Sequence, residues 1–180
     1  MHRDIAEVLI SAEAINTRVQ ALGRQISNDL AGREAVVVAL LKGSVLFFSD
    51  LIRSIDAPVK VDFAWASSYG HSTSSSGQIH LKVFPEEDLK GRTVVVVDDI
   101  LDTGRTLDTV VRRLKEEHGA GEVRTCVLLD KMARRVVPIR ADYSGFPVDD
   151  VFVVGYGLDF ADRYRNLPYI GVLKPECQRP

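Results

Sequence analysis

The stretch VVVVDDILDTGRT, from Val94 to Thr106, decides the fold. Four valines in a row favour a strand that is buried on both faces, as in a parallel sheet covered by helices. Asp98, Asp99 and Asp102 follow within five positions, where carboxylates repel one another and burial deprives them of water. Capping or turn formation would explain one aspartate. Three of them beside a glycine turn predict a site for a positive charge or for hydroxyl groups.

Strand-like and helix-like patterns alternate along the rest of the chain. Apolar or alternating runs predict strands at 35–41, 59–65, 79–83, 93–97, 123–130 and 151–154. Helical spacing of apolar residues predicts helices at 5–30, through Phe48, Leu51 and Ile52, and at 107–114. This order predicts an α/β fold with a mainly parallel twisted sheet flanked by helices, and binding at the carboxyl ends of its strands.

Composition excludes several classes of protein. The 180 residues are 46% hydrophobic and 27% charged, which is typical of a single folded domain. The net charge of -2 argues against partners such as nucleic acid or an anionic membrane. No apolar run approaches the length of a membrane span, and the charged N-terminus is unlike a signal peptide. With only two cysteines, Cys126 and Cys177, a reducing cytoplasmic location is expected.

The turn after the aspartates has the features of a phosphate site. Thr103 to Thr106 open a helix, whose first N–H groups and positive dipole end favour an anion. Gly104 lets the backbone come close to the ligand. The stretch is not a Walker A loop, and no GxGxxG follows a strand, which argues against nucleotide hydrolysis and nicotinamide chemistry. Lys42-Gly43 after the strand at 35–41 suggests a second anion site, although such a turn is usually only solvated.

Carboxylates and phosphate need a mediator if they are to be neighbours. The hydroxyl groups of a sugar are one mediator, because an ionised carboxylate accepts hydrogen bonds from a vicinal diol. A hard cation such as Mg²⁺ is the other. Together they predict a phosphorylated ribose with a metal-bound leaving group.

The same stretch resembles the phosphoribosyl diphosphate motif of type I phosphoribosyltransferases. Four more motifs are similar to the 6-oxopurine branch, the hypoxanthine-guanine phosphoribosyltransferases. They are LLKGS at 40–44, SSYG at 67–70, LLDK at 128–131 and VFVVGYGLDFADRYRNLPYIGVL at 151–173. The resemblance runs in family order from Val36 to Leu173.

The resemblance implies roles for the residues around the ribose and the phosphates. Asp98 and Asp99 would hold the ribose hydroxyls, directly or through Mg²⁺, although the family commonly has Glu then Asp there. Asp102 would be the general base near N7 of the purine. The 5-phosphate would bind at Thr103, Gly104, Arg105 and Thr106, and the diphosphate at Lys42, Gly43, Ser68, Tyr69 and Arg165.

It also implies a purine site. Lys131 would donate to the 6-oxo group and so reject adenine, Phe152 would stack on the base, and Val153 and Asp159 would flank its edge. Asp159 would be a further metal ligand beside Asp98 and Asp99. From the residues alone, Phe152 would more simply be a core residue and Arg165 part of a solvated helix face.

The activity expected from the resemblance is purine salvage in the cytoplasm. The 5-phosphoribosyl group would pass from 5-phosphoribosyl 1-diphosphate to N9 of hypoxanthine or guanine, giving IMP or GMP and diphosphate. One domain, 1–180, would carry a lid at 67–78 and a small hood segment from both ends of the chain, in a homodimer or homotetramer. Two alternatives stay open: a sensor of phosphoribosyl diphosphate that binds nucleic acid, for which no basic face is evident, and a relative that acts on another base such as xanthine.

Overall fold

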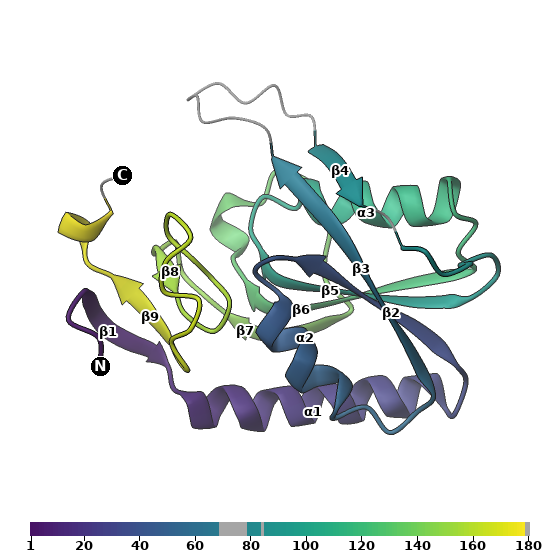
Figure 1. Ribbon diagram of the computed structural model, residues 1–180, viewed down its shortest axis with the longest axis horizontal. Coiled ribbons are helices and arrows are strands. Elements are labelled where there is room, and N and C mark those ends of the chain that lie inside the picture. The colour runs from purple at the N-terminus through teal and green to yellow at the C-terminus, as the bar shows by residue number, and fades with distance from the viewer. Residues whose placement is uncertain (69–78, 84, 179–180) are drawn as a thin grey trace.

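The computed structural model describes residues 1–68, 79–83 and 85–178. Its larger sheet has the strand order β4-β3-β2-β5-β6-β7 (Figure 1). Five strands run parallel to one another, in the order β3-β2-β5-β6-β7, and β4 pairs with the outer edge of β3 in the antiparallel direction. These strands are β2 (Ala35–Leu41), β3 (Val59–Ser68), β4 (Ile79–Val83), β5 (Thr93–Leu101), β6 (Glu122–Asp130) and β7 (Tyr143–Pro147).

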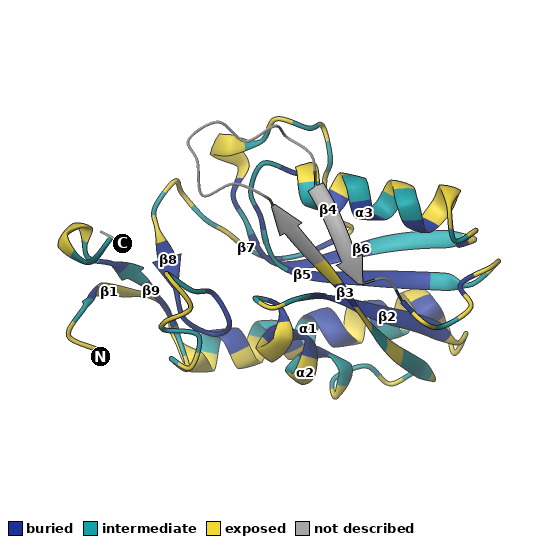
Figure 2. Ribbon diagram, turned by 45° about the horizontal axis from the view of Figure 1, so that its top comes forward, coloured by how far each residue is buried: buried dark blue, intermediate teal, exposed yellow. Residues whose placement is uncertain are grey.

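Helices cover both faces of this sheet, because alternate residues of its central strands point to opposite sides. Val37 and Val95 pack with α1 (Ala12–Leu30) and α2 (Val45–Ile52). Their neighbours along β2 and β5 pack with α3 (Arg105–Glu116) on the other face. Figure 2 shows the resulting band of buried residues along the middle strands. The predicted α/β fold, a mainly parallel sheet flanked by helices, is confirmed.

A second sheet of three antiparallel strands stands apart from the first (Figure 1). It has the order β1-β9-β8, with β1 (Ile5–Ile10), β8 (Val153–Val154) and β9 (Ile170–Leu173). The sheet therefore joins the beginning of the chain to its last strand. Short 3-10 turns at η1 (Met132–Arg134) and η2 (Pro175–Cys177) complete the regular structure of the described residues.

The prediction of one helix over 5–30 is wrong for its first part. Ser11 caps the helix, and its hydroxyl accepts a hydrogen bond from the Ala14 N–H at 3.1 Å, so residues before it lie outside the helix. Ile5–Ile10 instead pairs with β9. Two register irregularities in this pairing leave only the first and last residues of β1 buried.

Two further predictions need correction. The strand expected at 151–154 is shortened to Val153–Val154, and the strand expected at 93–97 continues to Leu101. That continuation has a partner, because β6 pairs with β5 as far as Leu101. Asp98 and Asp99 therefore lie within the strand rather than after it. None of the helices in the described part of the chain has the length and apolar character needed to cross a bilayer.

Candidate active site

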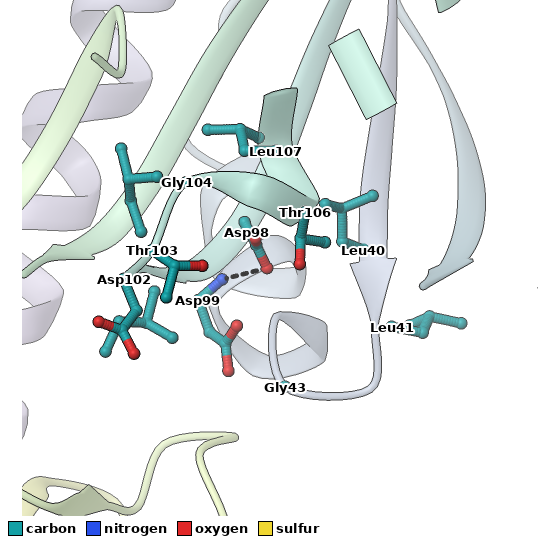
Figure 3. A pocket seen from close by; sticks show the side chains of 12 residues that line it. Leu40, Leu41, Gly43, Asp98, Asp99, Asp102, Thr103, Gly104, Thr106 and Leu107 are labelled. Atoms are coloured by element: carbon teal, nitrogen blue, oxygen red, sulfur yellow. Dashed lines mark hydrogen bonds between the residues drawn. The ribbon is translucent and has the colours of Figure 1, made fainter. Parts of the chain in front are cut away.

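The carboxyl ends of β2 and β5 lie next to each other, because these strands pair in parallel register from Ala35 with Thr93 to Ala39 with Val97. Between them is a pocket of about 350 Å³. It is lined on one side by Leu40, Leu41 and Gly43, and on the other by residues 98–104, Thr106 and Leu107 (Figure 3). The motif that suggested a phosphoribosyl site therefore forms one wall of a real cavity.

Asp98, which is buried, and Asp99, which is half-buried, form a pair of adjacent carboxylates at this pocket. Asp98 is only 8% exposed, and its side chain accepts a hydrogen bond from the Asp99 N–H at 3.0 Å. Burial, and then the neighbouring charge of Asp99, raise the pKa of Asp98 well above its ordinary value. Burial raises the pKa of Asp99 too, against hydrogen bonding and the positive charge of Arg165. Such a pair favours a bound cation or a hydroxyl donor.

Glycine at two positions lets three segments of the chain touch. A Cβ at Gly43 would lie 1.8 Å from an Asp99 carboxylate oxygen, and one at Gly157 would lie 2.0 Å from the carbonyl oxygen of Gly43. Gly157 also has a φ of +100°, where a side chain is strained. The peptide bond between Leu41 and Lys42 is cis. The loop after β8 is thus packed on the turn after β2, which in turn lies against β5.

The predicted phosphate turn begins α3 in the way that the sequence suggested. Gly104, with a φ of +86°, precedes the first helical residue, Arg105. Thr103 and Thr106 line the pocket (Figure 3), whereas the exposed Arg105 does not line it. The turn therefore offers hydroxyl groups and the positive end of a helix to an anion.

Asp102 has one carboxylate oxygen without a described partner. Its Oδ1 is buried and makes no hydrogen bond within the described residues, while its Oδ2 lies 3.5 Å from Nη1 of Arg134. A buried oxygen that makes no hydrogen bond is costly unless a ligand or water satisfies it. The side chain is therefore available to accept a proton or a hydrogen bond from something bound in the pocket.

Arg135 holds the segment that carries Asp102, and sequence reasoning missed this residue. Its guanidinium donates to the carbonyl oxygens of Leu101, Asp102 and Ile139 at 3.0, 2.9 and 2.6 Å. It also pairs with the Asp130 carboxylate at 2.5 Å. Nothing in the local pattern distinguishes Arg135 from its neighbour Arg134, because its four acceptors come from three separate segments of the chain.

The two cations expected to bind diphosphate lie together beside the pocket. Arg165 contacts Asp159 at 2.8 Å and Asp162 at 3.1 Å, and it donates to the Gly157 carbonyl at 2.7 Å. Lys42 lies 3.6 Å from Asp162 and over the ring of Trp65, 5.5 Å from its centroid. Sequence reasoning identified neither Asp162 nor Trp65.

The residues expected at the purine do not line the 350 Å³ pocket: Lys131 follows β6 of the larger sheet, whereas Phe152 and Val153 lie at β8 of the smaller one. Lys131, at the end of β6, is only 6% exposed, and its ammonium contacts Asp150 at 2.8 Å and the Val151 carbonyl at 3.0 Å. Phe152 is 41% exposed, and its ring is nearly perpendicular to that of Phe160, with the ring centroids 5.5 Å apart. It is therefore not the core residue that the simpler interpretation expected. Val153 is buried in β8.

Some predicted residues lie outside the described part of the chain. Tyr69 and the side chain of Ser68 are in this group, and so is most of the lid predicted at 67–78. Arg165 does not lie on a helix face, because the segment from Phe160 to Arg165 consists of turns and an isolated bridge.

The donor set at the pocket suits Mg²⁺ only in part. Within the described residues, no three His, Cys, Asp or Glu side chains are placed to share a metal ion, and Asp159 is paired with Arg165. Mg²⁺ is, however, usually bound by one or two carboxylates together with water and substrate phosphates. The Asp98–Asp99 pair fits that smaller role.

Residues 9–161 match the family model of the phosphoribosyl transferase domain. The hypoxanthine-guanine phosphoribosyltransferase of Streptococcus pneumoniae strain R6 is 46% identical over 176 residues, which cover 98% of this chain and 97% of that protein. The chain belongs to the hypoxanthine-guanine phosphoribosyltransferase family. The family assignment made from the sequence motifs is therefore confirmed.

Other members of this family differ in length. The chain is 47% identical over 176 residues to the bifunctional protein TilS/HprT of Listeria monocytogenes strain F2365, but it spans only 27% of that protein. Among solved structures, a hypoxanthine phosphoribosyltransferase from Staphylococcus aureus superposes with a TM-score of 0.94 at 41% identity, covering 100% of this chain and 97% of that one.

Proposed function

We propose that this member of the family transfers a 5-phosphoribosyl group from 5-phosphoribosyl 1-diphosphate to N9 of hypoxanthine or guanine. The observation that carries the proposal is the meeting of three kinds of group at one edge of the sheet. A phosphate-type turn, two adjacent carboxylates and two cations come together there from β2, β5 and the loop after β8.

The ribose phosphate would bind along β5 and the start of α3. The 5-phosphate would accept hydrogen bonds from the turn at 103–106, and the ribose hydroxyls would donate to Asp98 and Asp99. Lys42, Gly43 and Arg165 would face the diphosphate. Bound Mg²⁺ would neutralise charge on the diphosphate as the C1–oxygen bond breaks, with Asp98 and Asp99 as its protein carboxylates and Asp159 available only when it is released from Arg165.

Asp102 would act on the base. As N9 of the purine bonds to C1 of the ribose, the diphosphate leaves with the electrons of the broken C1–oxygen bond, and the purine must lose a proton. The unsatisfied Oδ1 of Asp102 supports a role as acceptor of that proton at N7. Arg134, 3.5 Å from the other oxygen, would hold the carboxylate in position.

Lys131 would select the base. Its ammonium offers only donors, so it suits the 6-oxo group of hypoxanthine or guanine and opposes the 6-amino group of adenine. The exposed ring of Phe152 supports a stacking role beside it. Xanthine differs from guanine at position 2 of the ring. None of the side chains assigned to the purine site is proposed to contact that position.

Association and location are proposed on separate grounds. Large apolar side chains are exposed on β3 and α2, at Val45, Leu46, Val61, Phe63 and Trp65, which supports this face as the contact in a homodimer or homotetramer. Cys126 and Cys177, both within the described residues, form no disulfide, which agrees with a cytoplasmic enzyme. One functional domain over 1–180, with the β1-β9-β8 sheet as its hood and residues 67–78 as its lid, completes the proposal.

The first test is release of diphosphate from 5-phosphoribosyl 1-diphosphate with Mg²⁺ and hypoxanthine, guanine, xanthine, adenine or uracil in parallel. We expect turnover with hypoxanthine or guanine and its loss on chelation. The Asp102→Asn variant should lose about 10²- to 10⁴-fold in kcat and still bind the nucleotide. Binding of phosphoribosyl diphosphate without turnover of any base would contradict the proposal and favour a sensor.

A further inference from the structure

One exposed carboxylate stands between the two cations proposed to bind diphosphate. Asp162 lies in the loop that joins β8 to β9, and its side chain is 74% exposed. The same oxygen, Oδ1, lies 3.6 Å from Nζ of Lys42 and 3.1 Å from Nη2 of Arg165. These cations come from distant parts of the chain, and Asp162 is the carboxylate that they share.

Neither cation needs Asp162 to keep its place. Arg165 also contacts Asp159 at 2.8 Å and donates to the Gly157 carbonyl at 2.7 Å. Lys42 is also held over the ring of Trp65. Removing the Asp162 charge therefore leaves both cations with partners, but it takes away the negative charge that lies between them.

The backbone around Asp162 adopts an unfavourable conformation in this loop. Ala161, Asp162 and Tyr164 have φ values of 51°, 58° and 74°, in the left-handed region that residues with a Cβ avoid. Phe160 and Arg163 exchange backbone hydrogen bonds of 3.2 and 3.0 Å across the turn. The turn thus presents Asp162 to the cations at a cost in conformational energy.

We infer that Asp162 is an internal counter-ion that occupies Lys42 and Arg165 in the free enzyme and competes with diphosphate for them. The inference rests on the proposed function, because it takes these two cations as the diphosphate site. A hydrogen bond from Arg165 and the charge of Lys42 lower the pKa of Asp162, so the carboxylate is ionised at neutral pH. The incoming diphosphate must displace this charge or bind beside it.

The test is the affinity of Mg²⁺-free diphosphate, measured by calorimetry on the whole protein at low salt. Asp162→Asn removes the charge while keeping the shape, and asparagine tolerates the left-handed backbone. We expect the Kd to fall about three- to tenfold, the scale of two exposed ion pairs, and the difference to shrink at 0.5 M salt as charges are screened, roughly within one Debye length. The KM for phosphoribosyl diphosphate should fall in parallel.

A matched control is Glu116→Gln, which removes one exposed carboxylate from an arginine pair of 3.6 Å at the far end of α3. It should leave the Kd unchanged. An unchanged or higher Kd for Asp162→Asn would overturn the inference, because Asp162 would then orient the cations or do nothing.

The Lys42→Ala variant separates failure of the inference from failure of the proposed site. If Lys42→Ala weakens diphosphate binding and Asp162→Asn does not strengthen it, only the counter-ion role is wrong. If Lys42→Ala leaves the Kd unchanged, the diphosphate site itself lies elsewhere, and both proposals are wrong. Thermal unfolding of each variant shows whether it is folded.

Discussion

Gly43→Ala gives the sharpest test of the pocket geometry. The added Cβ would lie 1.8 Å from Oδ2 of Asp99, 2.6 Å from its Cγ and 3.1 Å from its Oδ1. An ordinary van der Waals contact begins at 3.4 Å, so the carboxylate oxygen must retreat by about 1.6 Å. Because a misplacement of about 1 Å in an active site can cost about 10²-fold in rate, we expect at least that loss in turnover.

Stability should change little in the same variant. Gly43 is not among the glycines with positive φ, so alanine adopts its backbone without strain. A gain of about 0.4–1 kcal/mol from the less flexible unfolded chain then offsets part of the cost of moving Asp99. The free energy of unfolding, measured with urea, should stay within about 1 kcal/mol of the parent value.

Gly32→Ala is the matched control, with the opposite expectation. Among the described residues a Cβ at Gly32 meets nothing within 4 Å, but its φ is +78°. This variant should lose about 1–2 kcal/mol of stability to the left-handed backbone and keep full turnover. Turnover of Gly43→Ala within threefold of the parent, in a folded protein, would refute the claim that Asp99 is positioned by contact with Gly43.

Three further predictions concern the groups around the pocket. Burial raises the pKa of Asp98. The folded protein therefore loses no stability to this carboxyl at a pH below the pKa that Asp98 has in the unfolded chain, and it loses stability as the pH rises through the higher pKa of the folded state. Asp98→Asn should therefore raise the melting temperature at pH 8 by roughly 2–4 °C and abolish turnover. The melting temperature should not rise below about pH 3. The control variant Glu86→Gln, at an exposed position, should not raise it at any pH. Lys131→Ala should lower the kcat/KM ratio of hypoxanthine to adenine at least about tenfold, and an unchanged ratio in competition assays would place the 6-oxo group elsewhere. Lysine at position 135 cannot reproduce the four hydrogen bonds that Arg135 makes with Asp130 and three carbonyl oxygens. Arg135→Lys should therefore lower the free energy of unfolding, measured with urea, by about 2 kcal/mol. A loss under about 0.5 kcal/mol would show that Arg135 does not hold the segment that carries Asp102.

The central sheet was predictable because its strands are buried on both faces. AVVVALL at 35–41 and the valines at 94–97 have no polar residue to suggest another structure. The outer strands were harder. Tyr143–Pro147 contains both Gly and Pro, which argue against a strand in sequence, and it forms one only as the last strand beside β6.

The error at the N-terminus has a physical origin. Ile5, Val8, Leu9 and Ala12 have helical spacing, yet the segment is a strand up to Ile10. Register shifts in its pairing with β9 remove the alternation that would have marked a strand. Its partner strand begins at Ile170, far away along the chain, and no local pattern carries that information.

The candidate site was predictable where its chemistry is contiguous in sequence. Residues 98–106 were identified because carboxylates and a helix start occur side by side. Arg135, Asp162 and Trp65 were missed, because each contacts groups from distant parts of the chain that only folding brings near. Each also belongs to a residue type that is common on solvated surfaces or in cores.

The pairing of β1 with β9 has a consequence for biosynthesis. Ile5–Ile10 leaves the ribosome first among the strands, but its only neighbour in the smaller sheet, Ile170–Leu173, is made last. At about 5–20 residues per second, the first strand waits roughly 8–30 s for its partner. The loop that carries Asp159 and Arg165 ends at β9, so it too is fixed only then. A nascent chain can therefore complete its central sheet, which ends with Tyr143–Pro147, before β9 fixes the loop that is proposed to contribute to the diphosphate site.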